Sequence, residues 1–307
     1  MKNRIICWGA GKQALAGLLQ VEELYDIKYI VDKRQLGKVL EYTVYRPEKI
    51  AEDIEQIDYV FIMTYIYWFD VYKECIKMGV KTEKIRYWDI DLKRAVEIEE
   101  MYQQSIHSGN GEEIYLKNIF AGKENGVYVD VGAFHPMRVS NTLWAYRKGW
   151  RGINIEPNMD NMEYFKILRP EDKNVNCGIS DVVGEMTYYM LDDGAYNTFD
   201  YELLMQDNLT DRIVKEEKVP VRRLEDVLRE NNVREVDFLD IDVEGHEMNV
   251  LRGIDFSVDI KVILVEQLYM SLAEVVQSEP YQFLKEKGYE AVVKFGETVI
   301  YKKQNEG

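Results

Sequence analysis

The sequence has 307 residues, of which 46% are hydrophobic and 31% charged, so its composition excludes disordered and fibrous proteins and its length is typical of two domains. Asp and Glu outnumber Lys and Arg by 55 to 39, and the net charge of −16 argues against nucleic acid or an anionic membrane surface as a partner. The sequence contains neither a long uncharged apolar run nor a signal-peptide pattern, so we expect a cytoplasmic protein without membrane insertion. Its three cysteines lie far apart, which predicts buried free thiols.

The first 92 residues alternate short apolar runs with helical repeats. Residues 4–6 and 27–31 predict strands, and apolar residues recur with helical spacing over 14–24. A further apolar run at 59–63 is followed by another helical pattern. Because strands that alternate with helices build parallel sheets, we expect a small Rossmann-like domain over residues 1–92.

A glycine turn follows the first predicted strand of this domain. Gly9 and Gly11 open the helix, and Asp32 ends the next strand, which is the context of a dinucleotide fingerprint. Lys12 lies in the turn, where its ammonium group could meet a phosphate. These four residues predict a second nucleotide site. The alternative is a domain with a structural, dimerising or acceptor-docking role, which would make the protein a homo-oligomer or a carrier of its acceptor.

Residues 93–125 change in character and predict a helical linker, because a charged helical stretch leads into Gly- and Asn-containing turns. From residue 126 to residue 307 the strand, turn and helix pattern begins again. The last two strands are joined by Gly296-Glu297, which favours a hairpin and therefore an antiparallel edge on a mostly parallel sheet. The predicted strands of this second domain are 127–131, 152–155, 173–179, 184–191, 217–222, 236–241, 261–265, 289–294 and 297–302.

Polar residues follow the first two strands of the second domain, where ligands bind in open parallel sheets. Asp130 lies inside the apolar run VYVDVG and needs a fixed partner, while Gly132 allows a ligand close to the backbone. Asn141 and Thr142 stand where a helix begins and could bind a carboxylate. Glu156, at the end of the next strand, is placed for ribose hydroxyls. S-adenosylmethionine satisfies these features, and the spacing alone allows NAD equally well.

The segment 237–247, DFLDIDVEGHE, concentrates acidic residues and a histidine at a strand end. This is more than a helix cap requires, because one Asp suffices for capping. The cluster could bind a divalent cation through Asp242, Glu244 and His246, together with Glu266 from the next strand end, or it could supply a general base.

Four segments in this order resemble the FkbM-type S-adenosylmethionine-dependent methyltransferases: YVDVGAFHPMRVSNT, GWRGINIEPN, RPEDKNVNCGIS and FLDIDVEGHEMNVLRG. The resemblance covers about residues 110 to 303. It implies a class I methyltransferase fold, with a mostly parallel seven-stranded sheet whose last strand is antiparallel, and methyl transfer to a hydroxyl of a sugar or polyketide-like acceptor. One departure is the loop Ala133-Phe134-His135-Pro136, where such enzymes commonly carry a second glycine.

The resemblance places Glu156 at the ribose, Ser180 or Asp181 near the adenine, and Asp242 with Glu244 in the DVEG signature. We expect the cofactor to contact Asp130, Gly132, Ala133, His135, Asn141, Thr142, Glu156, Pro157, Ser180, Asp181 and Asp240. The candidate catalytic residues are Asp242, Glu244 and His246, which could remove the hydroxyl proton of the acceptor. Residues 192–215 form either a lid over the acceptor or an ordinary insertion.

The leading hypothesis is therefore an S-adenosylmethionine-dependent O-methyltransferase that acts on a small-molecule or glycan acceptor, such as a surface-glycan precursor. A divalent metal held by Asp242, Glu244, His246 and Glu266 is an alternative means of acidifying the hydroxyl. Two other functions remain open. The first is an NAD-dependent oxidoreductase that uses the first domain, and the second is a non-catalytic scaffold with a degenerate methyltransferase fold.

Overall fold

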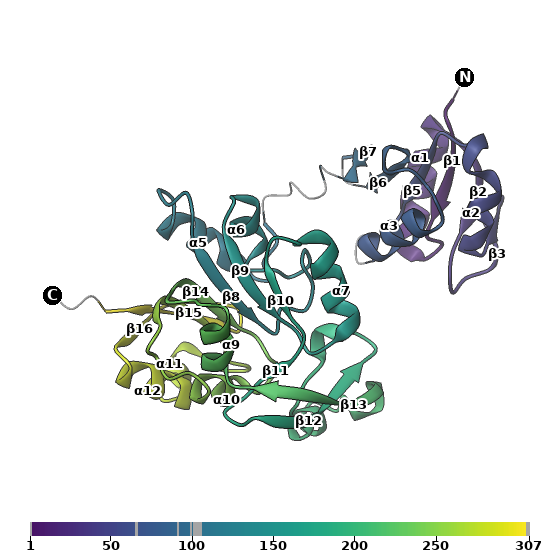
Figure 1. The fold of residues 1–307 in the computed structure, drawn as a ribbon. Helices are drawn as coiled ribbons and strands as arrows, with labels where there is room; N and C mark the ends of the chain where they lie inside the picture. The colour runs from purple at the N-terminus through teal and green to yellow at the C-terminus, as the bar shows by residue number, and fades with distance from the viewer. Residues whose placement is uncertain (1, 65–66, 91, 99, 101–105, 305–307) are drawn as a thin grey trace. The chain divides into compact units, whose positions relative to one another are not determined.

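The computed structural model divides the chain into two compact units, Met1–Ser105 and Ile106–Gly307 (Figure 1). It describes residues 2–64, 67–90, 92–98, 100 and 106–304, and only the backbone of Lys12 and Gln13. Within the described residues, no helix combines the length and the apolar character needed to cross a membrane. The three cysteines are buried and free, as predicted.

The first unit contains a seven-stranded sheet in the order β3-β4-β2-β1-β5-β6-β7. Its inner strands β4, β2, β1, β5 and β6 are parallel, and β3 and β7 add antiparallel edges. Leu18 of the first helix packs with strand residues such as Ile30 and Phe61 in a common core. The elements are β1 (Arg4–Trp8), α1 (Lys12–Leu24), β2 (Asp26–Val31), β3 (Gly37–Val39), β4 (Tyr42–Tyr45), α2 (Ile50–Asp53), β5 (Tyr59–Ile62), α3 (Trp68–Lys77), β6 (Ile85–Asp89) and β7 (Arg94–Glu97).

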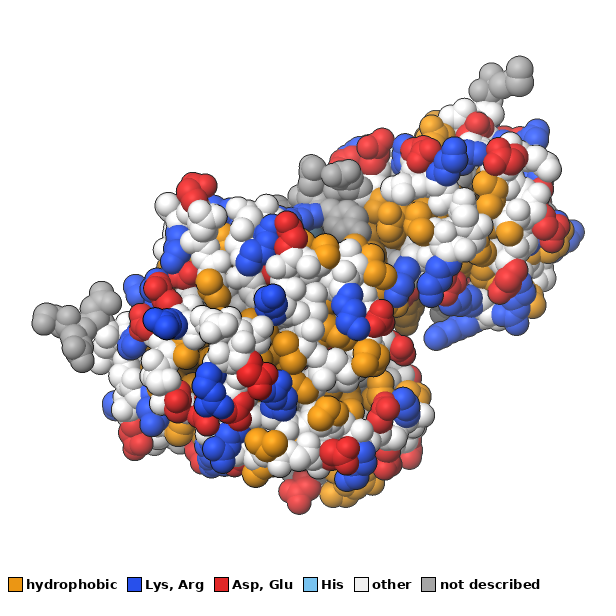
Figure 2. All heavy atoms as spheres, in the orientation of Figure 1, with side chains coloured by type: hydrophobic (Ala, Val, Ile, Leu, Met, Phe, Trp, Pro, Cys, Tyr) orange, Lys and Arg blue, Asp and Glu red, His pale blue; other side chains and the backbone are white. Residues whose placement is uncertain are grey.

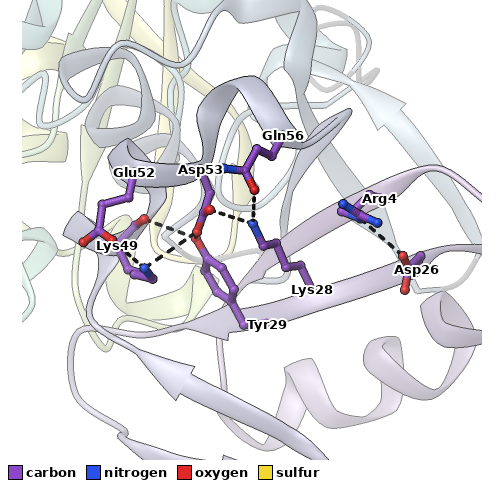
Figure 3. A network of polar contacts seen from close by, with 8 residues as sticks. All are labelled: Arg4, Asp26, Lys28, Tyr29, Lys49, Glu52, Asp53 and Gln56. Atoms are coloured by element: carbon purple, nitrogen blue, oxygen red, sulfur yellow. Dashed lines mark hydrogen bonds and ion pairs between the residues drawn. The ribbon is translucent and has the colours of Figure 1, made fainter.

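A polar network ties α2 to β2 in this unit (Figure 3). Lys28 Nζ lies 2.6 Å from Asp53 Oδ1, and the Tyr29 hydroxyl donates to Asp53 Oδ2 at 2.9 Å. The Lys28 ammonium therefore holds the pKa of Asp53 below its usual value. Because Asp53 is buried, these partners compensate the desolvation of its charge.

The boundary between the units differs from the predicted linker at 93–125. Arg94–Glu97 is not helical but forms β7, which pairs with β6 at the edge of the first sheet. Pairing and burial of Val96 in the sheet outweigh the local helical preference. Residues 101–105, the end of the predicted helix, lie outside the described residues. The rest of the predicted linker includes α5 (Glu112–Ile119), which belongs to the second unit.

The second unit contains a seven-stranded sheet in the order β10-β9-β8-β14-β15-β17-β16. Strand β17 is antiparallel to both of its neighbours, and the pairs from β10 to β15 are parallel. This confirms the predicted class I methyltransferase architecture and its terminal hairpin. The strands of this sheet and the helices that connect them are β8 (Val127–Val131), α6 (Leu143–Arg147), β9 (Arg151–Ile155), α7 (Met159–Leu168), β10 (Lys173–Val175), α9 (Leu224–Glu230), β14 (Glu235–Ile241), α10 (Glu247–Arg252), β15 (Asp259–Glu266), α11 (Leu272–Val275), α12 (Glu279–Glu286), β16 (Tyr289–Phe295) and β17 (Thr298–Lys303).

Helices cover both faces of this sheet. On one face Val129 and Leu239 pack with apolar residues of α9, α10 and α12. On the other face Tyr128 and Phe238 pack with α5 and α6, where Trp144 stacks on Phe238 with ring centroids 6.0 Å apart. Because side chains alternate along a strand, the acidic residues Asp130 and Asp240 share the α5 and α6 face.

A third, three-stranded sheet is inserted between β10 and β14. It has the order β11-β13-β12, with β12 antiparallel to β13. Its elements are β11 (Gly178–Ile179), β12 (Gly184–Leu191), α8 (Tyr201–Gln206) and β13 (Ile213–Arg222). On the face seen in Figure 2, the second unit carries acidic and basic side chains interspersed with apolar ones.

Candidate functional site

A pocket lies at the carboxyl ends of β8, β9 and β14, where the strand order predicts a ligand. Its empty volume is about 610 Å³, solvent at the mouth included. The sequence predicted five of its lining residues, Gly132, Glu156, Pro157, Asp242 and Glu244. The lining is completed by Phe134, Val139, Tyr188, Gly194, Ala195, Asn197, Phe199 and Val243.

Gly132 is required where the turn after β8 meets the turn after β14. Its φ is +81°, and a Cβ at this position would lie 1.8 Å from the carbonyl oxygen of Asp242. The same two turns are joined by the Asp242 amide, which donates to Val131 O at 3.1 Å. The glycine therefore permits a backbone contact that fixes Asp242 at the pocket.

Asp130 has the fixed partners that its buried position demands. The Thr142 hydroxyl donates to Asp130 Oδ2 at 2.6 Å and accepts from Arg169 Nη1 at 2.7 Å. Arg169 is fully buried, and its other terminal nitrogen donates to Ser140 Oγ at 2.8 Å and to the Pro136 carbonyl. Burial raises the pKa of Asp130, and the Thr142 hydroxyl and the Arg169 charge oppose that shift. Arg169 was not predicted from the sequence, and it braces the whole loop between β8 and α6.

His135 shapes this same loop. Its Nδ1 accepts from the amides of Met137 and Arg138, both at 3.1 Å, and it is not among the residues that line the pocket. Phe134 does line the pocket, with a φ of +47°, while the Ala133 amide donates to Ile155 O at 3.1 Å. The loop thus forms without a second glycine, by placing Phe134 in the left-handed region and by closing a turn on a histidine.

Glu156 lies at the base of the pocket and is almost fully buried. Its Oε1 accepts from the Asn158 amide at 2.7 Å and its Oε2 from the Phe134 amide at 2.9 Å. Burial nevertheless raises the pKa of Glu156 to about 8. The Asn161 side chain also hydrogen-bonds this carboxylate, and the lone pair that remains could accept a hydroxyl group of a ligand.

Two buried oxygens on the α6 side of the sheet lack partners among the described residues. They are Asn141 Oδ1 and Asp240 Oδ1, in residues that are both more than nine-tenths buried. Asp240 pairs in register with Asp130 on the neighbouring strand, and burial followed by that charge raises the pKa of Asp240. Unpaired acceptors in a negative environment are suited to a donor such as an ammonium group.

Three acids meet at the carboxyl ends of β14 and β15. Asp242, Glu244 and Glu266 each offer an oxygen, and these oxygens all lie within 4.8 Å of one another. Burial raises the pKa of Asp242 to about 6, and burial together with the neighbouring carboxylates raises that of Glu244 to about 8 and that of Glu266 to about 11. Such a group can hold a divalent cation, or it can share a proton and act as a base.

The turn that presents Glu244 is tightly constrained. Glu244 has a φ of +51° and Gly245 a φ of +95°. The Glu247 carboxylate holds the turn, because its Oε1 accepts from the amides of Val243 at 3.3 Å and Gly245 at 3.0 Å. A non-glycine residue held in this conformation is typical of functional sites.

His246 lies apart from the three acids. Its Nε2 is 3.2 Å from Ser180 Oγ, and Ser180 in turn donates to Asp181 Oδ1 at 3.2 Å. Burial lowers the pKa of His246, and the ring packs 5.5 Å from that of Phe199. His246, Ser180 and Asp181 do not line the pocket, so the structure does not bring His246 into the predicted ligand set with Asp242, Glu244 and Glu266.

The inserted sheet supplies one wall of the pocket. The rings of Tyr188 and Phe199 pack with their centroids 4.8 Å apart and their planes tilted by 47°, and Asn197 also belongs to the lining. The Thr198 hydroxyl donates to the Glu244 carbonyl at 2.6 Å, which ties the insertion to the acidic turn. Part of the segment predicted as a lid or insertion therefore borders the site. Tyr188 and Phe199 carried no sequence signal, because aromatic residues are common in cores.

In the first unit, the Asp32 carboxylate of the dinucleotide fingerprint hydrogen-bonds to nearby backbone amides. Asp32 Oδ2 accepts from the Ala10 amide at 2.9 Å, and Oδ1 accepts from the amides that follow at 2.7 and 2.9 Å. Gly9, with a φ of +130°, packs against Met63, whereas a Cβ at Gly11 would meet nothing within 4 Å. The side chain of Lys12 lies outside the described residues. The carboxylate of Asp32 therefore organises its own turn, which is the structural alternative to a ribose contact.

Comparisons with known proteins match the second unit to one family. The model of the methyltransferase FkbM domain matches residues 130–291. Among solved structures, UDP-D-quinovosamine 4-dehydrogenase from Vibrio fischeri is 16% identical, with 33% of this chain and 98% of that chain covered and a TM-score of 0.26. An engineered D-amino acid dehydrogenase bound to NADP⁺ is 11% identical, with 91% of this chain and 74% of that chain covered and a TM-score of 0.24. Both scores are too low to indicate a shared fold, and no curated protein matches. The match over more than half of its length shows that the chain belongs to the FkbM methyltransferase family.

Proposed function

We propose that the protein is an S-adenosylmethionine-dependent O-methyltransferase that acts on a hydroxyl of a sugar or glycan-type acceptor. The observation that carries the proposal is a single pocket in which Glu156 and the acids Asp242 and Glu244 meet at the carboxyl ends of β9 and β14. A class I methyltransferase sheet and membership of the FkbM family support the cofactor.

The residues of the pocket fit S-adenosylmethionine. Glu156 offers acceptor lone pairs to the ribose hydroxyls, and the rings of Tyr188 and Phe199 offer an apolar wall for the adenine. Asn141 and Asp240 do not line this pocket, but their unpaired oxygens are acceptors suited to the ammonium group of the methionine part. When bound, the cofactor supplies a methyl group on a sulfonium ion that is open to in-line attack.

The acidic group provides the base that such a transfer needs. Asp242 lines the pocket, and its pKa of about 6 leaves it mostly ionised near neutral pH while still able to take a proton. A hydrogen bond between Asp242 and the protonated Glu266 stabilises the Asp242 carboxylate. The acceptor hydroxyl would lose its proton to Asp242 as its oxygen takes the methyl group. His246 is then a positioning residue, because it contacts Ser180 and does not line the pocket.

A divalent cation is the alternative to a carboxylate base. Asp242, Glu244 and Glu266 could hold it, and the cation would acidify the acceptor hydroxyl. Chelation separates the two mechanisms. Full methyl transfer after EDTA treatment and removal of the chelator supports the base, whereas loss of transfer that Mg²⁺ or Mn²⁺ restores supports the metal.

The first experiment is calorimetric titration of the full chain with S-adenosylmethionine, S-adenosylhomocysteine and NAD. We expect the first two to bind and Glu156→Gln to weaken both at least tenfold, because two ribose contacts would be lost or weakened. Glu290→Gln, at an exposed carboxylate on β16, is the matched control and should change neither affinity. Binding of NAD alone would instead favour an oxidoreductase. Binding of none would favour a non-catalytic scaffold.

A further inference from the structure

A second cavity adjoins the cofactor pocket and shares Glu244 with it. It has an empty volume of about 1110 Å³, solvent at its mouth included. Glu266 also lies in its wall, so the cavity borders two members of the three-acid group, whose third member is the proposed base Asp242. The remaining lining residues are Tyr196, Leu203, Leu204, Asp207, Leu209, Arg212, Leu268, Tyr269 and Glu297.

The charge of this cavity is strongly one-sided. Four lining residues are acidic, namely Asp207, Glu244, Glu266 and Glu297, and Arg212 is the single basic one. Arg212 is already paired, since its guanidinium lies 2.8 Å from Asp192 and 5.4 Å from the ring centroid of Tyr196. Lys294 pairs with Glu297 at 3.3 Å but does not line the cavity. A phosphate or carboxylate entering the cavity would therefore meet the carboxylates of Asp207 and Glu297 without an unpaired lining cation, which opposes its binding.

The uncharged part of the wall favours a ring with apolar faces. Tyr196 and Tyr269 are both exposed, and the Tyr269 hydroxyl donates to Asp207 Oδ2 at 2.7 Å, which orients that ring. Leu203, Leu209 and Leu268 add partly buried apolar surface. Aromatic and aliphatic side chains beside hydrogen-bond acceptors suit a compound whose C–H faces pack while its hydroxyl or amino groups donate.

We propose that this cavity is the acceptor site and that the acceptor is an uncharged or amine-bearing polyhydroxyl compound without phosphate or carboxylate groups. The inference rests on the proposed methyltransferase function and narrows it, because it excludes a nucleotide-activated or phosphorylated sugar as the methylated molecule. The ammonium group of an amine-bearing acceptor would sit among Asp207, Glu297 and the acids at the pocket junction.

The test compares D-glucosamine with D-glucosamine 6-phosphate by saturation-transfer NMR on the full chain saturated with S-adenosylhomocysteine. We expect glucosamine to receive saturation and its phosphate to bind at least about tenfold more weakly. The double variant Asp207→Asn/Glu297→Gln should reduce this preference to about threefold or less, and Glu290→Gln should leave it unchanged. Equal binding, preference for the phosphate, or no saturation of glucosamine would overturn the proposal.

A second measurement identifies the acceptor class without assuming the probe. The full chain is incubated with S-adenosylmethionine labelled in the methyl group and with small-molecule extract divided on an anion exchanger. Labelled product in the unretained fraction supports the proposal, and labelled product in the retained fraction overturns it. Failure of the calorimetric titration with S-adenosylmethionine would instead refute the methyltransferase function itself, so the two failures are distinguishable.

Discussion

The contact between the turns after β8 and β14 is tested by Gly132→Ala. The added Cβ would lie 1.8 Å from Asp242 O and 2.8 Å from its carbonyl carbon, so the backbone must move. Left-handed φ costs an alanine about 1–2 kcal/mol, and the overlap adds about 1–3 kcal/mol. We expect a loss of about 2–5 kcal/mol in the free energy of unfolding, measured by urea denaturation. Movement of the two turns would also deform the backbone that lines the pocket, which should weaken S-adenosylmethionine binding at least about tenfold, measured by calorimetry on the folded variant.

Gly149→Ala is the matched control for this prediction. Gly149 also has a positive φ, +97°, but an added Cβ would meet nothing within 4 Å. Gly149→Ala should lower the free energy of unfolding only by the cost of the left-handed φ, about 1–2 kcal/mol, and should retain full cofactor affinity. The reasoning is refuted if the two variants are equally stable, or if Gly132→Ala binds S-adenosylmethionine as tightly as the wild type.

Three further predictions concern charged groups of the site. Asp242→Asn should lower turnover by about 100-fold or more with little change in cofactor affinity. It should also abolish the rise in rate that the wild type shows as pH increases through about 6. An unchanged pH–rate profile would show that Asp242 is not the base. The pKa of Glu244 is raised to about 8 from 4.5, so its contribution to stability is present at low pH and is lost as pH rises through 8. Urea unfolding at several pH values should therefore show a smaller decline for Glu244→Gln than for the wild type, and parallel curves would contradict this. Arg169→Met should lower the free energy of unfolding by about 3–5 kcal/mol, because it leaves Asp130 buried without its cation. Arg169→Lys should restore part of that free energy. Equal stability of Arg169→Met and the wild type in urea denaturation would refute this role.

Much of the fold follows from local patterns in the sequence. The period of the apolar runs located the main strands of the second unit, and Gly296 correctly marked the hairpin between β16 and β17. Gly132, Glu156 and Asp242 were found because strand ends in parallel sheets meet at one edge, so residues far apart in sequence converge there.

The parts that were missed depend on long-range contacts. Arg169 precedes a proline at the end of α7, and nothing local indicates that its guanidinium bonds Ser140 and Thr142 almost thirty residues earlier. The strand β7 was read as helix because its pairing with β6 is invisible in its own composition. His246 was grouped with the metal ligands by proximity in sequence, although its side chain bonds Ser180 of a different segment.

The three-acid group also predicts how the affinity for the cofactor depends on pH. Among the described residues no lysine or arginine pairs with Asp242, Glu244 or Glu266, so protons stabilise the group when no cation is bound. The sulfonium of S-adenosylmethionine carries a positive charge that S-adenosylhomocysteine lacks. Its arrival should favour the ionised form of Glu244 and release a proton, so affinity for S-adenosylmethionine should gain on affinity for the homocysteine product as pH rises from about 6 to about 9. Calorimetry in buffers of different ionisation enthalpy measures both the ratio and the proton release. A ratio independent of pH would show that the acids do not sense the charge that the reaction consumes.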